Sequence, residues 1–306
     1  MPGRVPANMR VTDSPTFSIV VPTYNRPEQL AACLHACTLL DYPSDRFEVI
    51  AVDDGGTSPL DHVFARFSGT LPLRLLRQEN SGPAAARNRG ALAAKGRFLA
   101  FTDDDCAPTS DWLRALEAEF DVSPGSAVGG RTINRLSQNV YSTASQVLIS
   151  YLCAYYNSTP KKARFCPSSN LAFPAEHFRA IGGFDVTYPR AAAEDRDICE
   201  RWLYSGYALT YAPDAVVVHS HELSLRTFLC QHFRYGQGAF YFHRVRSQRR
   251  QMRMRVEPIS FYLKMLCYPF ACGQGRRAPL VALLLLIAQI ANGLGFFWNF
   301  TTGKMK

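Results

Sequence analysis

The sequence lacks two features that would place it in a common structural class. Its nine cysteines are scattered without a C-x-x-C pair, so a zinc site is not expected. Residues 1–15 are polar and contain proline, unlike the apolar run of a secretory signal peptide. We therefore expect reduced thiols in a cytosolic domain.

Charged residues are also sparse, at 19% of the 306 residues, whereas hydrophobic residues make up 47%. This composition excludes global disorder and supports a sizeable core, in one large domain or two small ones. Acids are outnumbered by bases, and the net charge of +9 favours an anionic partner such as phosphates, nucleic acid or a membrane surface.

Short apolar strands alternate with helical patterns in the first third of the chain. Strands are predicted over 17–22, 47–52, 73–76 and 96–101, and helices over 28–40, 60–67 and 83–94. This alternation predicts an α/β fold with a mainly parallel sheet. Two further short strands are predicted over 208–211 and 215–219.

The strand that ends at Phe101 runs into three consecutive carboxylates, Asp103, Asp104 and Asp105. Adjacent acids repel one another, and an oxygen-rich cluster suits a hard divalent cation such as Mg²⁺ or Mn²⁺. Ligands of open α/β sheets bind beyond the carboxyl ends of the strands, where these acids would lie. The alternative is an acidic loop ahead of a helix that starts near Asp111.

Two other strands end in polar residues on the same predicted edge of the sheet. Tyr24 follows Pro22, and Asp53 and Asp54 follow the second strand. The tyrosine ring is suited to covering a base, and either carboxylate to accepting from a base N–H or a ribose hydroxyl. The alternatives are an ordinary Asp-Asp-Gly turn and a tyrosine that only packs.

Seven short stretches occur in a characteristic order: VVPTYNR (20–26), VDDGG (52–56), GPAAARNRG (82–90), FTDDD (101–105), SNLAF (169–173), GGFD (182–185) and EDRD (194–197). Together they resemble the motifs of family 2 glycosyltransferases, which have the GT-A fold, a Rossmann-like sheet with helices on both faces. Each motif is weak alone, and their common order is the specific signal.

The resemblance implies a nucleotide-diphosphate sugar donor and a divalent metal, Mn²⁺ or Mg²⁺. Asp103 and Asp105 correspond to the ends of the D-x-D pattern, with Asp104 between them. All three are acids, so which two face the metal and the ribose stays open. The residues implied around the base and nucleotide are Pro22, Tyr24, Asp53 or Asp54, and Arg87.

The resemblance also implies that Asp195 is the general base that takes the acceptor proton, in a single displacement with inversion. Its neighbour Glu194 is placed on the acceptor side. A helix-capping role is the alternative for acids at the start of this helix, Glu194 and Asp197 among them.

As in some GT-A enzymes, His219 is a candidate additional ligand of the metal or the diphosphate, although a structural role is the more common one and His221 competes with it. Processive relatives carry Q-x-x-R-W. Here Arg201 and Trp202 are present on the acceptor side, but Ile198 occupies the Gln position, which predicts a non-processive enzyme.

The last third of the chain suggests a membrane. Residues 224–241 have helical spacing, and 243–255 form a basic run that suits an anionic bilayer, with nucleic-acid binding as the alternative. Residues 278–298 contain no charged residue. The length of this stretch is about that needed to span a bilayer. The shorter apolar stretch 259–272, containing Lys264 and Pro269, would lie in the interface or form one arm of a hairpin.

We therefore expect a tail (1–16), a GT-A domain (17–222, with a nucleotide and metal half to 115 and an acceptor half from 116) and a membrane-anchoring region (223–306). The predicted enzyme adds one sugar to a glycan or lipid-linked acceptor at the cytoplasmic face of the inner membrane, without nucleic acid. The alternatives are a nucleotidyltransferase, disfavoured by the lack of a glycine-rich basic phosphate loop, and a non-catalytic binding module.

Overall fold

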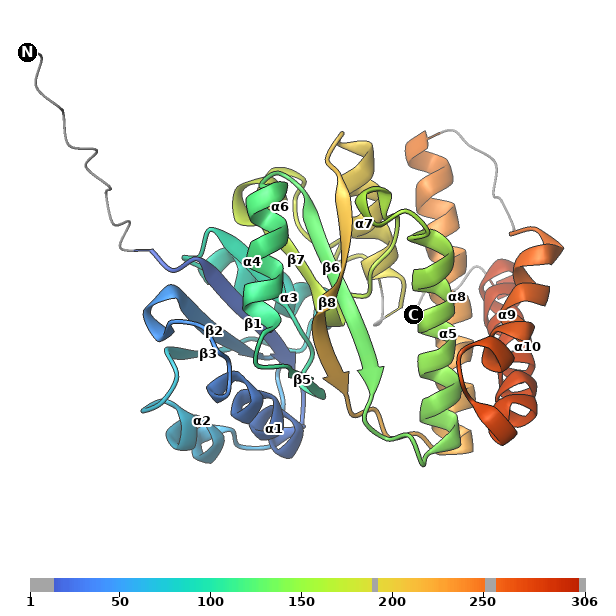
Figure 1. Cartoon of the computed structure of the whole chain (residues 1–306), viewed down its shortest axis with the longest axis horizontal. Helices are drawn as coiled ribbons and strands as arrows, with labels where there is room; N and C mark the ends of the chain where they lie inside the picture. The colour runs from blue at the N-terminus through green and yellow to red at the C-terminus, as the bar shows by residue number, and fades with distance from the viewer. Residues whose placement is uncertain (1–13, 189–191, 251–256, 303–306) are drawn as a thin grey trace, which may run out of the picture.

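The computed structural model of the chain describes residues 14–188, 192–250 and 257–302. Most of the predicted tail, the end of the basic run (251–256) and the lysines at 304 and 306 lie outside these residues. The described chain forms one eight-stranded sheet with helices on both faces and a further group of helices beside it (Figure 1).

The first four strands form as predicted. The parallel strands β1 (Phe17–Thr23), β2 (Phe47–Asp53), β3 (Leu73–Arg77) and β4 (Phe98–Phe101) lie in the order β3-β2-β1-β4. Helices α1 (Pro27–Thr38), α2 (Asp61–Phe67) and α3 (Pro83–Ala93) connect them. Every residue of β1, β2 and β4 is buried, which explains why these strands are mostly apolar runs without alternation.

The other half of the sheet is mixed in direction. Beyond β4 come β7 (Leu171–Pro174), β6 (Ala127–Asn134), β8 (Leu209–His219) and β5 (Cys106–Pro108). The β6–β8 pair is parallel, whereas the β4–β7, β6–β7 and β5–β8 pairs are antiparallel. The predicted α/β sheet with helices on both faces is confirmed, and its parallel part is largely the first half.

The two short strands predicted over 208–211 and 215–219 are a single strand, β8. Gly130 of β6 pairs with Ala212, but the next residue, Arg131, pairs with Val216, so residues 213–215 bulge out of the ladder. Pro213 has no N–H to donate, and the pairing is therefore interrupted there without ending the strand.

Helices on the two faces of the sheet each bury one tryptophan. One face is covered by α1, α2 and α4 (Trp112–Val122). The other face is covered by α3, α6 (Ala175–Ala180) and α7 (Glu194–Tyr204). The Trp112 indole donates to the Asn170 side chain (2.9 Å), and that of Trp202 to the Ala208 carbonyl (2.7 Å). Both rings are completely buried.

Four helices form the group beside the sheet: α5 (Val140–Tyr156), α8 (Leu225–Arg250), α9 (Ile259–Ala271) and α10 (Ala278–Thr302). They share a core that includes Leu148, Phe228, Met265 and Leu285. Short 3-10 turns occur at Ser44–Arg46, Pro160–Lys162, Ser168–Asn170 and Gly275–Arg277.

Two details of this group differ from the sequence interpretation. Helix α5 lies in a stretch where no motif was recognised. Helix α9 continues through Pro269, which lies in its last turn and removes the one hydrogen bond that residue 269 would donate to the Met265 carbonyl. Within the described residues, Gly275–Thr302 is the one helix long and apolar enough to cross a membrane.

Candidate active site

All three acids after β4 form ion pairs with basic residues from other elements, and two of them, Asp104 and Asp105, share Arg26. Arg26, just before α1, contacts Asp104 (3.2 Å) and Asp105 (3.3 Å). The Nε2 atom of His219, at the end of β8, lies 3.2 Å from Asp105 Oδ1. The Thr23 hydroxyl donates to Asp104 (2.8 Å). These contacts compensate the charge of two neighbouring carboxylates that are largely withdrawn from water.

The pKa values of these two acids move in opposite directions. Burial raises the pKa of Asp104 to about 6, although Arg26 partly opposes this change. For Asp105 burial acts in the same sense, but His219 and then Arg26 outweigh it and lower the pKa to about 2. Burial lowers the pKa of His219, but the hydrogen bond to Asp105 raises it on balance. Asp105 therefore ionises at a much lower pH than Asp104.

The third acid, Asp103, is linked to the acceptor half of the chain through Arg87. The Arg87 guanidinium contacts Asp103 (2.7 Å) and Glu194 (3.1 Å), and its carbon lies 5.5 Å from the centre of the Phe184 ring. Arg87 and Glu194 are both buried. One cation thus joins the end of β4 to the start of α7.

The chemistry of the residues around Asp105 fits a divalent cation. One ligand atom each of Asp105, Cys106 and His219 lies within 4.8 Å of the others. Burial raises the pKa of the Cys106 thiol well above its ordinary value, so the thiol is neutral and a poor ligand. The carboxylate that remains suits a hard cation such as Mn²⁺ or Mg²⁺, and the imidazole is a ligand for transition metals in general.

The polar ends of β1 and β2 are tied together at the carboxyl edge of the sheet. Asn25, with φ of 54°, accepts hydrogen bonds from the backbone N–H of Thr57 (2.7 Å) and Ser58 (3.0 Å). Pro22 is buried within β1, whereas Tyr24 beside it is 49% exposed. The tyrosine ring is therefore accessible at the edge where the sequence predicts the base.

The two acids after β2 are occupied by local donors. Asp54 accepts from the Gln78 side chain (2.7 Å) and from the N–H groups of Ser81 (2.9 Å) and Gly82 (2.8 Å). Asp53 accepts from the Gly56 N–H (2.9 Å). Asp54 thus fixes the loop that leads into α3, the helix that carries Arg87, as well as lying near the predicted base site.

The predicted base, Asp195, lies in the first turn of α7 after an unusual backbone turn. Ala193 has φ of 72°, a conformation that is unfavourable for alanine and marks local strain. Burial and the charge of Glu194 raise the pKa of Asp195 to about 7, although the Arg196 N–H donates to it (2.7 Å). A pKa near neutrality suits a group that must take up a proton.

Arg201 and Trp202, which the sequence placed on the acceptor side, do not face the site. Arg201 contacts Asp197 (2.7 Å) and donates to the carbonyls of Ile181 and Gly183. Trp202 is completely buried. This prediction is corrected: the two residues fix α7 from behind, because the helix turns them toward the core.

A cavity of about 710 Å³ joins the acids at the end of β4 and at the start of α7 to the helical group. Its side toward the sheet is lined by Asp103, Arg87, Glu194, Asp195 and His219. The opposite lining comes from α5, α8, α9 and α10, and includes Leu148, Ile149, Phe261, Met265, Asn292 and Phe296. The sequence interpretation assigned the last three helices to anchoring alone and missed their part in the site.

Helix α8 contributes polar side chains to this cavity. His232 lines it with 1% exposure, and neither ring nitrogen has a hydrogen-bond partner among the described residues. Burial lowers the pKa of His232 to about 4, so the ring is neutral. Burial and the charge of Asp195 raise the pKa of Tyr235, one turn further along. Polar residues such as His232 and Tyr235 recur on a helix face that is otherwise apolar, and this pattern was the sequence signal that could have indicated a cavity here.

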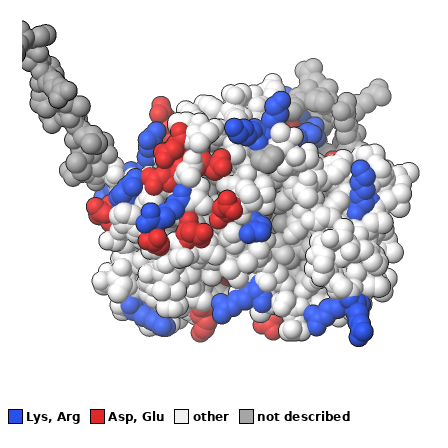
Figure 2. Space-filling view, in the orientation of Figure 1, with Lys and Arg blue, Asp and Glu red and all other residues white. Residues whose placement is uncertain are grey.

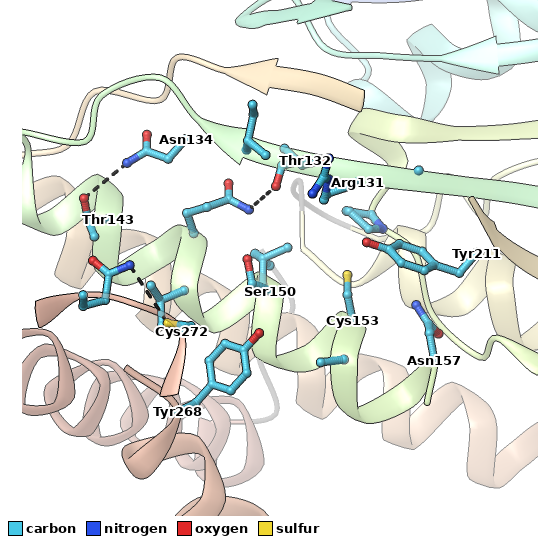
Figure 3. Close-up of a pocket in the computed structure, with 18 of the residues that line it drawn as sticks. Arg131, Thr132, Asn134, Thr143, Ser150, Cys153, Asn157, Tyr211, Tyr268 and Cys272 are labelled. Carbon is cyan, nitrogen blue, oxygen red and sulfur yellow. Dashed lines mark hydrogen bonds between the residues drawn. The ribbon is translucent and has the colours of Figure 1, made fainter. Parts of the chain in front are cut away.

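A second cavity of about 490 Å³ lies on the other side of α5 (Figure 3). Arg131, Tyr211 and Tyr268 surround it, and Gln146 donates to the Thr132 carbonyl (2.9 Å) in the wall that both cavities share. Among the residues that the structure describes, its lining contains no carboxylate. The larger cavity, which has both bases and acids, is therefore the candidate active site.

Comparisons with known proteins agree with this geometry. The chain is 29% identical over 229 residues to the glycosyltransferase AglE of Haloferax volcanii, with 73% of each chain aligned. It is 32% identical over 199 residues to a pre-mycofactocin glycosyltransferase of Mycobacterium tuberculosis, which covers 62% of this chain but 41% of that protein.

Solved structures share the fold. The mannosyltransferase PcManGT from Pyrobaculum calidifontis, in complex with GDP-Man and Mn²⁺, matches with a TM-score of 0.61 at 23% identity, covering 95% of this chain and 80% of that one. The family described as "Glycosyl transferase family 2" matches residues 18–182, which is more than half of the chain. The chain therefore belongs to glycosyl transferase family 2 and is a glycosyltransferase, as its ordered motifs predicted.

Proposed function

We propose that the protein transfers one sugar from a nucleotide-diphosphate sugar to a lipid-linked acceptor at the cytoplasmic face of the inner membrane. The observation that carries this proposal is the shared cavity. Its catalytic wall holds Asp103, Asp195 and His219, and its other wall is built from apolar helices. A polar head and a hydrocarbon chain can therefore occupy one continuous site.

The donor would bind at the carboxyl edge of β1, β2 and β4. Tyr24 covers the base, and Asp53 accepts a hydrogen bond from the base or ribose. Arg26 and Arg87 lie next to the acids and supply positive charge for the diphosphate. Asp104, which is buried and held by Thr23, is the inner acid of the three and supports the ribose side.

A divalent cation would be held by Asp105 and His219, with Asp103 on the same cavity wall. When bound, Mn²⁺ or Mg²⁺ stabilises the negative charge that develops on the leaving diphosphate. The mannosyltransferase PcManGT, which shares the fold, was solved with GDP-Man and Mn²⁺, which supports this assignment.

Asp195 is the proposed general base. The acceptor oxygen attacks the anomeric carbon, the bond from that carbon to the diphosphate breaks, and the acceptor proton moves to the Asp195 carboxylate. Attack opposite the leaving group inverts the configuration. Glu194, paired with Arg87, keeps its charge beside Asp195 and so maintains the raised pKa of the base.

The acceptor side supports a single transfer to an amphiphilic molecule. The Gln of the processive pattern is replaced by Ile198, which is completely buried and cannot contact a growing glycan. The neutral His232 and the apolar residues of α9 and α10 are suited to a polar group followed by a hydrocarbon chain.

Transfer by the purified full chain tests this proposal. UDP-, GDP- and dTDP-sugars are screened with a polyprenyl phosphate or a lipid extract as acceptor, with and without Mn²⁺ or Mg²⁺. We expect labelled sugar to move into the organic phase with one donor, and only when metal is present. Transfer to water-soluble glycans but not to lipid would contradict the acceptor class.

Two variants separate the roles. Asp195→Asn should retain donor binding while transfer falls about 10²–10⁴-fold, the usual contribution of a general base. Asp105→Ala should lose metal-dependent donor binding. Asp121→Asn, at an exposed site on α4, is the matched control and should behave as wild type. Near-normal transfer by Asp195→Asn would place the base elsewhere.

A further inference from the structure

The position of α10 in the fold determines how the protein can contact a membrane. Its length of about 37 Å, at 1.5 Å per residue, is enough to cross a bilayer. Its packing is not that of an independent span, because one face lies along α8. A methyl group on Gly236 of α8 would collide with the Asn292 carbonyl, and one on Gly295 would collide with the Phe233 carbonyl. The two helix backbones are therefore in direct contact.

The opposite side of α8 is packed against the catalytic domain. A Cβ atom on Gly238 would lie 2.6 Å from Ala192, in the segment that leads to the proposed base. Further along α8, Arg249 contacts Asp185 (2.6 Å) and Asp197 (2.5 Å). Helix α8 is thus held between α10 and the active site.

These contacts exclude an α10 that crosses the bilayer perpendicular to its plane. If α10 crossed the bilayer, Asn292 and its neighbours would lie within the hydrocarbon core, which is about 30 Å thick. Gly236 and the exposed Arg234 of α8 would lie at a similar depth, as would Asp195, which shares a cavity with Asn292. Charged groups at that depth are costly, and the catalytic domain would have to enter the lipid.

The outward face of α10 is suited to lipid along its whole length. Exposed large apolar residues recur every three or four positions, and form one stripe: Leu280, Leu283, Leu286, Ile290, Leu294 and Phe297. On α9, Ile259, Leu263 and Phe270 are exposed as well. Because the other face of α10 is packed on protein, this outward face is the part of the helix that is free to contact lipid.

The charge around this stripe complements anionic lipid. Residues 223–306 contain thirteen Lys and Arg and a single acid, Glu257, so this segment carries +12, whereas the rest of the chain carries −3. Lys264, within α9, and Arg276 and Arg277, just before α10, are exposed. Figure 2 shows acidic side chains gathered over the sheet, while the part over α9 and α10 is nearly uncharged, with basic groups toward its margins.

We propose that α10 does not cross the membrane but lies in its plane, with the apolar stripe of α9 and α10 docked on the surface of an anionic lipid bilayer. In this orientation the stripe enters the boundary between head groups and acyl chains. The cavity behind α10 then lies at the level of the lipid, with Asp195 on its cytosolic side. This inference rests on the proposed membrane-bound function, and it fixes the geometry of the contact.

Tryptophan depth measurements test the orientation. Trp298 on α10 is 57% exposed, whereas Trp112 and Trp202 are completely buried and shielded from lipid. The native chain, and Leu283→Trp and Ile290→Trp in a Trp298→Phe background, are bound to vesicles of equal parts phosphatidylcholine and phosphatidylglycerol. Lipids brominated at different acyl positions then report the depth of each indole.

An in-plane helix should give the same shallow depth, about 5–10 Å into the boundary, at all three positions. A spanning helix would separate positions 283 and 290 by about 10 Å and positions 283 and 298 by about 22 Å in depth. Leu39→Trp in the Trp298→Phe background, at the exposed end of α1, is the control and should not be quenched. A graded profile, or no quenching at any of the three positions, would overturn the proposal.

Vesicle charge and transfer activity are measured on the same samples. Binding should weaken at least about tenfold on vesicles of phosphatidylcholine alone, since each basic residue near an anionic surface contributes to binding. Equal binding to both vesicles would contradict the charge complementarity. Active transfer with a graded depth profile overturns the orientation alone, whereas a flat profile without transfer overturns the proposed function alone.

Discussion

Replacing Arg87 by methionine should destabilise the protein in a pH-dependent way. Arg87 neutralises Glu194, whose side chain is 7% exposed, and Asp103, which is 29% exposed. Removing one partner of a buried ion pair costs about 3–5 kcal/mol, because a buried charge is left uncompensated. Asp103 keeps contact with solvent, so most of the loss falls on Glu194 and we expect about 3 kcal/mol at pH 8.

The sign of the pH dependence follows from the proton balance of Glu194. Burial raises the pKa of Glu194 in the folded protein, and Arg87 opposes this effect. Without Arg87 the folded-state pKa rises further above the unfolded value, so the folded variant binds more protons than the unfolded one. Its stability therefore falls as pH rises through that window, and the deficit should shrink toward about pH 5.

Urea unfolding measures this effect, with the buried Trp112 and Trp202 as fluorescent reporters. The double variant Arg87→Met/Glu194→Gln removes both charges and should recover about 2 kcal/mol relative to Arg87→Met, since contacting residues are not additive. Equal destabilisation at pH 5 and pH 8, or additive effects of the two changes, would refute the assignment of Glu194 as the stranded charge.

Three further predictions concern the base and the helical wall of the cavity. Transfer should fall about tenfold per pH unit below about pH 7, because protonated Asp195 cannot accept a proton; a flat kcat/KM profile from about pH 5 to 8 would contradict this. Gly236→Ala should lower the free energy of unfolding by about 1–3 kcal/mol, because the added methyl group forces α8 away from α10. Gly293→Ala is the control and should be neutral, since a Cβ atom there meets no atom within 4 Å. Equal effects of the two changes would disprove the close contact. His232→Phe should keep or raise stability, since it removes an unpaired buried imidazole, but should raise the KM for the acceptor; an unchanged KM would show that His232 does not contact it.

The donor edge of the site was predictable because it is built from local patterns. Strands that are buried on both faces appear as apolar runs, and the residues after them, Asp53 and Asp103 among them, must gather at one edge of a parallel sheet. The ordered motifs identified the family for the same reason.

The acceptor side was predicted less well, because its geometry depends on which way a helix turns its residues. Trp202 belongs to a recognisable pattern near Asp195, yet it lies in the core on the far side of α7. The part of His232 in the cavity depends on packing between segments far apart in the sequence. Periodicity along α8 showed an apolar face but not that this face meets the active site.

The helical group, which forms one wall of the large cavity and carries the exposed apolar stripe, has a consequence for how this enzyme can be modified. Cutting the chain near residue 222 to obtain a more soluble protein would remove the half of the substrate cavity that contains His232 and Asn292. It would also uncover the backbone turn at Ala193, against which α8 is packed. Solubility is better sought by replacing outward residues such as Leu283 or Leu294 with polar ones, which leaves the inner faces of α8 and α10 in place.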